Sequence, residues 1–436
     1  MVVGLGRTGL SCVRYLHSRG LEFAVTDSRA APPELAALRE LAPDAEVRIG
    51  GFDETLLDGA STVIASPGVS LREPFLRRAA ERGVAIVGDI ELFAREAQAP
   101  IAAITGTNGK STVTSLLAHM AASAHKRVLA GGNLGRPALD LLDEATPDLY
   151  VLELSSFQLD TTQSLRAAAA SVLNVTPDHL DRYADMQEYA ASKARIFQGA
   201  SAAVVNLDDL AVRTMSHSAP RVLGFSLHAD PAADYYALRE GEDVVLMGGR
   251  TRLALLSELK ITGLHNAANA LAALAMCDAL GLARAACVDA LRTFAGLPHR
   301  SQWVADVAGV RYVNDSKGTN VGATLAAVAG MSGSLVVIAG GQGKGQDFAP
   351  LARAFRGKVR HVVLIGQDAP QLAASLRGVA TLEFAGDMQD AVKRAASAAR
   401  GGEVVLLSPA CASLDMFRDY AHRGDTFAAA VRGLST

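Results

Sequence analysis

The sequence predicts an α/β protein with parallel sheets. Short apolar runs rich in valine and isoleucine alternate with longer stretches rich in alanine, leucine and arginine, which is the pattern of βα units. Glycine-rich loops follow two of the apolar runs, one near the amino terminus and one around residue 106. Such loops are typical of sheets that bind ligands where their strands end. With 436 residues the chain is too long for one core, so we expect several domains.

The composition excludes several classes of protein. Half of the residues are hydrophobic and only 5% are aromatic, so alanine, valine and leucine must fill the cores. The net charge of -3 gives no electrostatic basis for binding nucleic acid or a membrane surface. No apolar stretch is long enough to span a bilayer, and no signal peptide precedes the first glycine loop. The protein is therefore expected to be cytoplasmic and monomeric. Its cysteines, which show no metal-ligand spacing, are expected to be reduced thiols: Cys12, Cys277, Cys287 and Cys411.

The first domain is expected to cover residues 1–92 and to begin with a phosphate-binding loop. In "VVGLGRTG", Gly4, Gly6 and Gly9 match the G-x-G-x-x-G pattern that holds a pyrophosphate between a strand and a helix. Asp27 ends the next apolar run, where an acid that contacts a nucleotide would lie. Because only three residues precede the first glycine, we expect a clipped first strand. The pattern predicts a Rossmann-like domain and leaves open whether the ligand is a redox dinucleotide or a UDP-sugar.

The middle domain, residues 93–297, carries the strongest signal. In "ITGTNGKST", Gly106 and Gly109 let backbone N–H groups approach phosphate oxygens, Lys110 would reach the β- and γ-phosphates, and Ser111 could bind Mg²⁺. An isoleucine replaces the first glycine of the common G-x-x-x-x-G-K-[ST] loop. Because an apolar run precedes the loop and a helical stretch follows it, we interpret it as the ATP loop of a P-loop ATPase-like domain with a mostly parallel sheet. Further strands are expected at residues 149–155, 170–176 and 201–209, and a helix at 263–281.

Chemically active side chains follow two of the expected strands in the middle domain. Glu153 ends one strand, and His179 and Asp181 follow another, so these groups can approach the ATP loop at the edge where parallel strands end. A carboxylate such as Glu153 suits Mg²⁺, whereas a histidine is a less common ligand for this ion. Lys193 lies on a predicted helix, where its spacing alone indicates a solvated lysine.

The third domain is expected to cover residues 298–436 after a second linker, "AGLPHRSQWV". Apolar runs again alternate with helical stretches, so this domain is also predicted to be Rossmann-like. Its strands are expected at residues 309–316, 333–341, 360–366 and 402–410.

Seven motifs, in order along nearly the whole chain, resemble the Mur ligase family. They are "GTNGKST", "ELSSFQLD", "NVTPDHLDRY", "GLHNAANALAA", "LPHR", "NDSKGTN" and "LLSPACASLDMF". The ATP loop and "HNAANALAA" are typical of the whole family, whereas "NDSKGTN" and "SPACASLDMF" are similar to its D-glutamate-adding branch. The resemblance implies an ATP-dependent ligase that adds D-glutamate to UDP-N-acetylmuramoyl-L-alanine during peptidoglycan precursor synthesis.

The resemblance also implies ligand contacts for individual residues. The UDP-sugar would be held by Arg7, Thr8, Asp27, Ser28, Arg29, Asn133 and His179. ATP would bind Gly106, Thr107, Asn108, Gly109, Lys110, Ser111, Thr112, Asn266, Asn269, Arg300 and Asp315. D-Glutamate would bind Thr319, Lys344, Ser413 and Tyr420, the last of which stands where the family pattern leads us to expect a phenylalanine.

The family pattern assigns catalysis to Lys110, His179, Lys193 and Lys317, and two Mg²⁺ ions to Ser111, Glu153, His179 and Lys193. Lys193 would carry a carbamate formed from CO2, which turns a cation into an anionic ligand. The substrate carboxylate would attack the γ-phosphate of ATP, and the amine of D-glutamate would then displace phosphate from the acyl-phosphate. His179 or a nearby carboxylate would take the proton of the amine. We expect the third domain to close about "AGLPHR" and to exclude water.

The sequence leaves four alternatives to this function. Another branch of the family would add a different amino acid, such as L-alanine or L-glutamate. Folylpolyglutamate synthetase shares the ATP and ligase domains but lacks an amino-terminal glycine-loop domain. An NAD(P)-dependent dehydrogenase is favoured by "GLGRTG" and opposed by the sequence after residue 100. A non-catalytic nucleotide-binding regulator is disfavoured because Glu153, His179 and Lys317 are all present.

Overall fold

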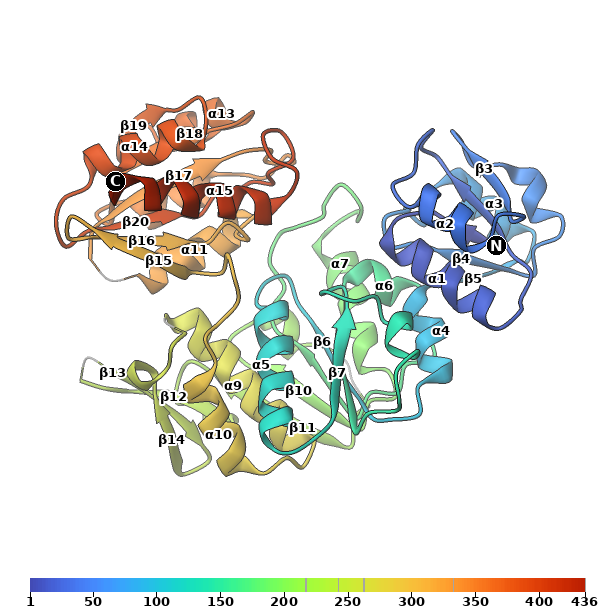
Figure 1. The fold of residues 1–436 in the computed structure, drawn as a ribbon. Helices are drawn as coiled ribbons and strands as arrows, with labels where there is room; N and C mark the ends of the chain where they lie inside the picture. Colours follow the sequence, from blue (N-terminus) through green and yellow to red (C-terminus); the bar gives the residue numbers. More distant parts are fainter. Residues whose placement is uncertain (216–217, 242, 262, 332, 436) are drawn as a thin grey trace.

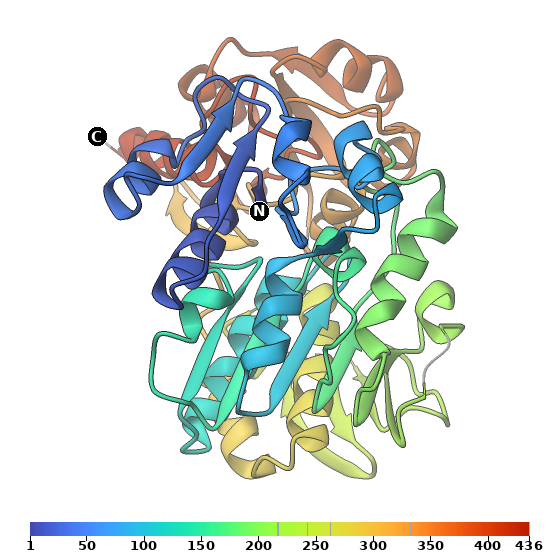
Figure 2. The same cartoon turned by 90° about the vertical axis from the view of Figure 1, so that its right-hand side faces the viewer.

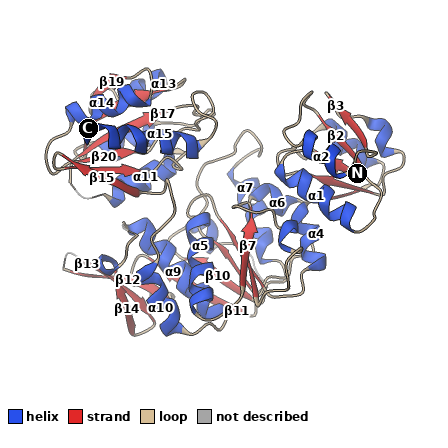
Figure 3. Cartoon of the chain, in the orientation of Figure 1, coloured by secondary structure: helices blue, strands red, loops and turns tan. Residues whose placement is uncertain are grey.

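The computed structural model describes residues 1–215, 218–241, 243–261, 263–331 and 333–435, and these residues form three separate β-sheets (Figure 1). The sheets follow one another along the chain, and helices cover their faces (Figure 3). We call the parts that they organise the first, middle and third domains. The predicted α/β class is confirmed.

The first domain contains a parallel sheet in the strand order β3-β2-β1-β4-β5. This is the strand order of a Rossmann-like half. Strands are added on one side of β1 and then on its other side, and a ligand crevice lies where this order reverses. Strand β1 is only two residues long, as the sequence predicts, yet it pairs with both of its neighbours. The strands are β1 (Val2–Val3), β2 (Ala24–Asp27), β3 (Glu46–Ile49), β4 (Thr62–Ala65) and β5 (Ala85–Val87). The helices are α1 (Arg7–Ser18), α2 (Leu35–Leu41), α3 (Pro74–Glu81) and α4 (Asp89–Glu96), with a 3₁₀ turn η1 (Glu54–Leu57).

The middle domain contains a nine-stranded sheet in the order β14-β13-β12-β11-β10-β9-β6-β8-β7. Its strands run parallel from β7 to β12, and the hairpins β12–β13 and β13–β14 add an antiparallel extension at one edge. The strands are β6 (Ile101–Thr105), β7 (Val128–Gly132), β8 (Leu149–Glu153), β9 (Ala169–Val172), β10 (Ala202–Asn206), β11 (Arg221–Ser226), β12 (Tyr235–Glu240), β13 (Asp243–Gly248) and β14 (Thr251–Leu255). The α-helices are α5 (Lys110–Ser123), α6 (Ser156–Asp160), α7 (Met186–Ala194), α8 (Leu210–Arg213), α9 (Leu264–Ala279) and α10 (Arg284–Thr293). The 3₁₀ turns are η2 (Leu139–Leu141), η3 (Arg195–Phe197) and η4 (Leu256–Glu258).

The third domain contains a six-stranded sheet in the order β15-β16-β20-β17-β18-β19. It is parallel except for the edge strand β15, which forms an antiparallel hairpin with β16. The strands are β15 (Gln302–Val307), β16 (Val310–Asn314), β17 (Leu335–Gly340), β18 (Val359–Ile365), β19 (Thr381–Phe384) and β20 (Val404–Leu407). The helices are α11 (Val321–Gly330), α12 (Ala349–Phe355), α13 (Ala369–Ser375), α14 (Met388–Ala398), α15 (Tyr420–Arg432) and the 3₁₀ turn η5 (Gly433–Ser435).

The first and middle domains share a hydrophobic core, whereas the third has its own. One cluster of buried side chains runs from Leu10 on α1 through Phe93 on α4 to Tyr150 on β8. The rings of Phe93 and Tyr150 meet edge to face at a centroid distance of 5.0 Å. The third domain packs separate clusters on the two faces of its sheet. Figures 1 and 2 show the first and third domains over the same end of the middle domain, where β7 ends.

Candidate active site

The predicted ATP loop connects β6 to the amino terminus of α5 at the centre of the middle sheet. Gly106 and Gly109 have φ angles of 148° and 83°, so the loop uses backbone conformations that favour glycine. Helix α5 begins at Lys110, and the first N–H groups of a helix have no partner within it. Together with the helix dipole, these groups make the loop a binding site for an anion such as phosphate.

Two lysines converge on one carbonyl of this loop. Lys110 Nζ donates to the oxygens of Gly106 and Thr107 at 2.8 and 2.9 Å, and Lys193 Nζ donates to the Gly106 oxygen at 3.0 Å. Lys193 has only 1% of its surface exposed, although its position on α7 had predicted a solvated side chain. Burial, reinforced by the charge of Lys110, lowers the pKa of Lys193 well below its usual value. Burial thus favours the neutral form of the Lys193 amine.

Glu153 ends β8 beside these lysines and has one oxygen without a partner. Its Oε1 accepts a hydrogen bond from Asn133 Nδ2 at 2.6 Å, while its Oε2 is buried and unpaired. The residue is 3% exposed. An unpaired carboxylate oxygen away from water is costly unless a cation or a donor compensates it. This orphaned oxygen is a position at which a metal ion would fit.

His179 lies in a turn after β9 with a left-handed backbone, at a φ of 56°. Its ring meets Phe157 edge to face at a centroid distance of 4.9 Å. Burial lowers the pKa of His179, which keeps the imidazole neutral near pH 7 and able to accept a proton. The neighbouring carboxylate of Asp178 accepts a hydrogen bond from the His179 backbone N–H at 2.9 Å.

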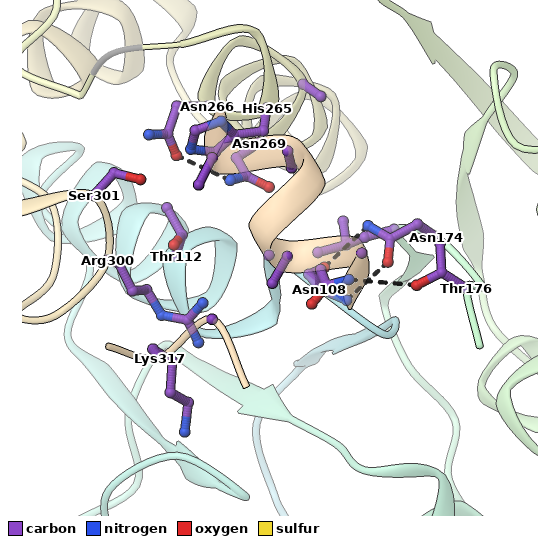
Figure 4. A pocket seen from close by; sticks show the side chains of 18 of the residues that line it. Asn108, Thr112, Asn174, Thr176, His265, Asn266, Asn269, Arg300, Ser301 and Lys317 are labelled. Atoms are coloured by element: carbon purple, nitrogen blue, oxygen red, sulfur yellow. Dashed lines mark hydrogen bonds between the residues drawn. The ribbon is translucent and has the colours of Figure 1, made fainter. Parts of the chain in front are cut away.

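A cavity of about 260 Å³ lies beside the ATP loop, between the middle and third domains. Seven of the residues assigned to ATP from the sequence line it: Asn108, Gly109, Thr112, Asn266, Asn269, Arg300 and Asp315. Gly106, Thr107, Lys110 and Ser111 belong to the loop beside it, and Arg300 reaches that loop by donating to Ser111 Oγ at 2.8 Å. Figure 4 shows Asn266, His265 and Asn269 at one end of the cavity and Asn108, Asn174 and Thr176 at the other.

Sequence reasoning missed part of this lining. Asn174 holds the ATP loop, because its side chain and its carbonyl accept hydrogen bonds from the N–H groups of Asn108 and Thr107 at 2.8 and 2.9 Å. It lies within the motif "NVTPDHLDRY" at the end of a strand, so its position could have identified it. His265 also lies within a quoted motif. The contribution of α11 carried no signal, since it consists of small residues: Gly322, Ala323, Ala326 and Ala327.

The residues assigned to D-glutamate lie on loops of the third domain. Lys317 Nζ lies 3.6 Å from the centre of the Tyr420 ring. Burial, reinforced by Arg300, lowers the pKa of Lys317 to about 8. The loops that contain Lys344 and Ser413 are joined by an antiparallel bridge between Gln342 and Ala412. Thr319 follows Lys317 in a tight turn, with its N–H bonded to the Lys317 carbonyl at 2.8 Å. The structure thus brings these residues to neighbouring loops of one domain.

A second cavity, of about 580 Å³, lies between the first and middle domains. It is lined by the predicted residues Arg7, Thr8, Asp27, Ser28, Arg29 and Asn133, but His179 is not part of its lining. Both oxygens of Asp27 already have protein partners. They accept hydrogen bonds from the N–H of Leu5 and from the backbone and guanidinium of Arg29, at 2.6 to 2.9 Å. Burial alone would raise the pKa of Asp27, but these bonds outweigh it and hold the pKa at about 2. Asp27 therefore fixes the glycine loop and Arg29.

Within the described residues, no group of three or more histidine, cysteine, aspartate or glutamate side chains could hold a metal ion. In the same part of the chain, no helix is long and apolar enough to cross a membrane.

Family models match all three domains. Residues 1–88 match the model described as Mur ligase MurD-like, N-terminal domain; residues 104–277 match the Mur ligase middle domain; and residues 299–411 match the Mur ligase, glutamate ligase domain. The chain is also similar, over almost its full length, to curated relatives whose identity to it reaches 53%. It belongs to the Mur ligase family.

Two of these relatives carry a more specific name. A protein of Nitrosococcus oceani is 53% identical over 99% of this chain and 96% of its own length, and one of Pseudomonas aeruginosa is 50% identical over 100% and 98%. Both are named UDP-N-acetylmuramoylalanine–D-glutamate ligase.

Solved structures with low sequence identity share the fold. The UDP-N-acetylmuramate-alanine ligase of Thermotoga maritima is 19% identical, with a TM-score of 0.62 over 99% of both chains. The MurF ligase of the same organism, solved with ADP, is 16% identical, with a TM-score of 0.63 over 96% of this chain and 97% of its own. A folylpolyglutamate synthase of Mycobacterium tuberculosis covers only 79% of this chain, with 18% identity and a TM-score of 0.59.

Proposed function

We propose that this chain is an ATP-dependent ligase that joins the carboxylate of UDP-N-acetylmuramoyl-L-alanine to the amine of D-glutamate. The reaction would extend a cytoplasmic precursor of peptidoglycan. The observation that carries the proposal is the identity of about half of all residues, across all three domains, to relatives named for this reaction. The chain is proposed to act as a monomer, since all of its candidate sites lie within one chain.

The nucleotide triphosphate is assigned to the cavity beside the ATP loop. The free N–H groups at the start of α5 would bind its phosphates, and Asn266 and Asn269 on α9 would lie near the base. Arg300 and Lys317 bring two further cations to the same cavity. The carboxylate of Asp315, whose pKa burial raises to about 6, lies in that lining as well.

The UDP-sugar is assigned to the cavity between the first and middle domains. The glycine loop and the start of α1 offer backbone N–H groups to the diphosphate, and Arg7, Thr8, Ser28 and Arg29 surround the same space. Asn133 lies in the lining and also bonds to Glu153, so it would connect the sugar end of the substrate with the ATP loop. His179 lies outside this lining, and its contact with the substrate remains part of the proposal.

Catalysis would rest mainly on positive charge. Attack of a carboxylate on the γ-phosphate brings anions together, and the acyl-phosphate that forms must be held away from water until the amine arrives. Lys110, Arg300 and Lys317 supply charge around the transferred group. The attacking amine must lose a proton, and the neutral imidazole of His179 is a candidate general base only while its free ring nitrogen does not bind Mg²⁺. A carboxylate such as that of Asp178 is the other candidate for this proton.

The magnesium ions are assigned to Ser111, Glu153, His179 and a carbamylated Lys193. The unpaired buried oxygen of Glu153 fits a cation, and Lys193 Nζ lies against the same loop, where a carbamate would add an anionic oxygen ligand. Lys193 suits this modification because its buried amine can lose its proton and react with CO2. When bound, Mg²⁺ would supply charge that offsets the repulsion between the carboxylate and the triphosphate.

D-Glutamate is assigned to the loops of the third domain, with Thr319, Lys344, Ser413 and Tyr420 around it. Tyr420 replaces the phenylalanine expected from the family pattern, and its ring already holds Lys317. Lys344 is exposed and has a left-handed backbone conformation, and its cationic side chain would bind a carboxylate of D-glutamate. The alternative function within the family is a ligase of another branch, which differs in the amino acid that it accepts.

Release of phosphate tests the proposal. The enzyme is given ATP, Mg²⁺, bicarbonate and UDP-N-acetylmuramoyl-L-alanine, and D-glutamate is compared with L-glutamate, L-alanine and no amino acid. Release that requires D-glutamate supports the proposed function. Release with a different amino acid would retain the ligase mechanism and reassign the branch. A redox function, the remaining alternative, would require reduced nicotinamide to bind, which fluorescence titration measures.

A further inference from the structure

Arg182 joins the first and middle domains by a contact that the proposed chemistry does not use. Its guanidinium donates to the backbone oxygens of Pro67, Gly68 and Val69 at 3.3, 3.3 and 3.2 Å. One flat face of the guanidinium lies over the ring of Phe157, 4.3 Å from the ring centre. A planar group with five N–H donors can hold several carbonyls of one turn while it stacks on an aromatic ring, and lysine cannot reproduce this geometry. Arg182 therefore clamps a segment of one domain onto a side chain of the other.

The clamped segment is a wall of the UDP-sugar cavity. Pro67, Gly68 and Val69 all line that cavity. The segment turns back on itself through a hydrogen bond from the Val69 N–H to the Ser66 carbonyl at 2.9 Å. Ser66 Oγ also donates to the carbonyl of Gly4 at 2.7 Å. A Cβ at Gly4 would stand only 2.9 Å from the Val69 side chain, so the wall packs directly against the glycine loop.

The same arginine belongs to the turn that carries His179. The backbone N–H groups of Arg182 and Tyr183 donate to the His179 carbonyl at 2.9 and 3.2 Å. Phe157, under the guanidinium, also contacts the imidazole of His179 edge to face and stacks on Tyr183 at a centroid distance of 5.8 Å. Arg182 therefore connects the cavity wall with the turn that contains His179.

From these contacts we infer that Arg182 is a positioning residue for the UDP-sugar substrate. It holds residues 67–69 against the middle domain, so that the cavity has its binding shape before the substrate arrives. Pre-formed cavities bind more tightly because the ligand does not have to order the wall. The inference rests on the proposed function, which assigns the UDP-sugar to this cavity. It predicts that Arg182 affects affinity for that substrate and leaves affinity for ATP unchanged.

An exposed ion pair between the same two domains provides a matched control. Arg72 donates to Glu188 on α7 at 2.6 Å, and the side chains of both are about half exposed, at 54% and 47%. Arg72 follows the cavity wall in sequence but is not part of the lining of the UDP-sugar cavity. An exposed pair of this kind contributes little to stability, about 0–1 kcal/mol. Removing it tests whether any loss of a contact between the domains has the same effect.

The experiment compares Arg182→Met, Arg182→Lys and Arg72→Met with the unsubstituted enzyme. Methionine keeps an apolar chain over Phe157 but removes the N–H donors, so the packing is retained and the clamp is lost. Binding of UDP-N-acetylmuramoyl-L-alanine is measured by calorimetry without ATP, and KM is measured for each of the three substrates. For Arg182→Met we expect Kd and KM for the UDP-sugar to rise about tenfold, the loss typical of hydrogen bonds from a charged donor. KM for ATP should stay within about twofold, and Arg182→Lys should fall between the two enzymes.

The inference is overturned if Arg182→Met binds the UDP-sugar as tightly as the unsubstituted enzyme. Equal rises in KM for all three substrates, or the same rise in Arg72→Met, would also overturn it, since either would show a general loss of domain contact. Failure of the proposed function is a different result. In that case the unsubstituted enzyme itself would not bind UDP-N-acetylmuramoyl-L-alanine, or would not release phosphate when D-glutamate is present.

Discussion

At the residue scale, Lys193 shows how burial changes the chemistry of an ordinary side chain. Its spacing on α7 predicts a solvated ammonium, and only the resemblance to the family singled it out. In the structure it is buried against the ATP loop and the Tyr189 ring, with Lys110 close enough to oppose its charge. Lys110 and Glu153 could be predicted from the sequence because their positions follow from a local motif and a strand end. Burial of Lys193 depends on contacts between distant segments, which local patterns do not reveal.

The carbamate on Lys193 is testable by chemical rescue. Lys193→Ala should be nearly inactive, because it would remove the proposed anionic ligand and leave a cavity. Short carboxylic acids such as acetate or formate should restore part of the activity by occupying the place of the carbamate. Turnover is measured as phosphate release across a range of acid concentrations. Lys393→Ala, at an exposed lysine of α14, is the control and should behave like the unsubstituted enzyme. Failure of every short acid to rescue would indicate a structural lysine.

Gly109 offers a second test at this scale. A Cβ at this position would stand 2.4 Å from Asn269 Oδ1, and its φ of 83° is unfavourable for other residues. Gly109→Ala should raise KM for ATP about tenfold or more, because Asn269 and the loop must move apart. Gly20→Ala is the control for backbone strain without a steric clash, since Gly20 has a φ of 64° and an added Cβ would meet open space. That variant should lose about 1–2 kcal/mol of stability and keep the KM for ATP. Similar KM values for both variants would contradict the close approach to Asn269.

At the scale of elements, the order of strands and helices could be predicted well, while their pairing could not. The apolar runs predict β8, β9 and β10 of the middle sheet and four strands of the third, and the short strand β1 was expected from the few residues before Gly4, whereas β3, β7, β11, β12 and β19 had no predicted counterpart. The antiparallel edge strand β15 and the antiparallel strands β13 and β14 were not predicted. Whether two strands pair parallel or antiparallel depends on the connection between them, which the apolar runs do not show. The small residues of α11 carried no sign of the cavity that they line. The domain boundaries at residues 92 and 297 stay predictions.

Helix α4, which connects the first domain to the middle one, is anchored by a buried carboxylate. Glu91 is 2% exposed and accepts hydrogen bonds from the N–H groups of Gln163 and Ser164, at 2.7 and 2.8 Å, and from the Ser164 hydroxyl and Arg95. Burial alone would raise the pKa of Glu91, but these bonds outweigh it and hold the pKa at about 2. The helix therefore depends on an ionised acid.

The depressed pKa of Glu91 predicts a pH dependence of stability. A carboxyl whose pKa is lower in the folded state stabilises the fold above its unfolded pKa, and this contribution is lost as the pH falls through its folded pKa. Glu91→Gln should therefore lower the free energy of unfolding by about 2 kcal/mol at pH 7. The difference from the unsubstituted protein should shrink as the pH falls from about 4.5 toward 2. Urea unfolding at several pH values measures it, with exposed Glu22→Gln as the control. A difference that is independent of pH would contradict the ionised anchor.

At the scale of the whole molecule, the domains are joined in two different ways. The first and middle domains share an apolar core, which favours a fixed arrangement. The third domain reaches the middle one through polar contacts and through close packing of α11 against the start of α9. Asn320, which caps α11, donates to Asp178 at 3.1 Å and to Asn108 of the ATP loop at 3.4 Å. Arg300 donates to Ser111. The hinge at "AGLPHR" stays a prediction; polar contacts of this kind break and re-form at lower cost than a buried core.

Asn320→Ala tests whether these contacts matter for turnover. The substitution removes a helix cap as well as the contacts to Asp178 and Asn108, so some stability will be lost, about 1 kcal/mol. Asp387→Ala serves as the matched control. It removes the cap of α14, whose hydrogen bond goes to the N–H of Asp390 within the third domain. We expect both variants to melt earlier, and only Asn320→Ala to lose kcat/KM for ATP, by about fivefold or more. Equal activity in the two variants would show that the contact is incidental.

The proposed ligase chemistry depends most directly on an acyl-phosphate formed between the substrate carboxylate and the γ-phosphate of ATP. The decisive measurement labels the terminal carboxylate of UDP-N-acetylmuramoyl-L-alanine with ¹⁸O and follows the label after turnover with ATP and D-glutamate. Attack of that carboxylate on the γ-phosphate predicts that one labelled oxygen leaves with the inorganic phosphate and that the amide forms only when D-glutamate is present. Phosphate that carries no label would contradict the proposed ligase chemistry.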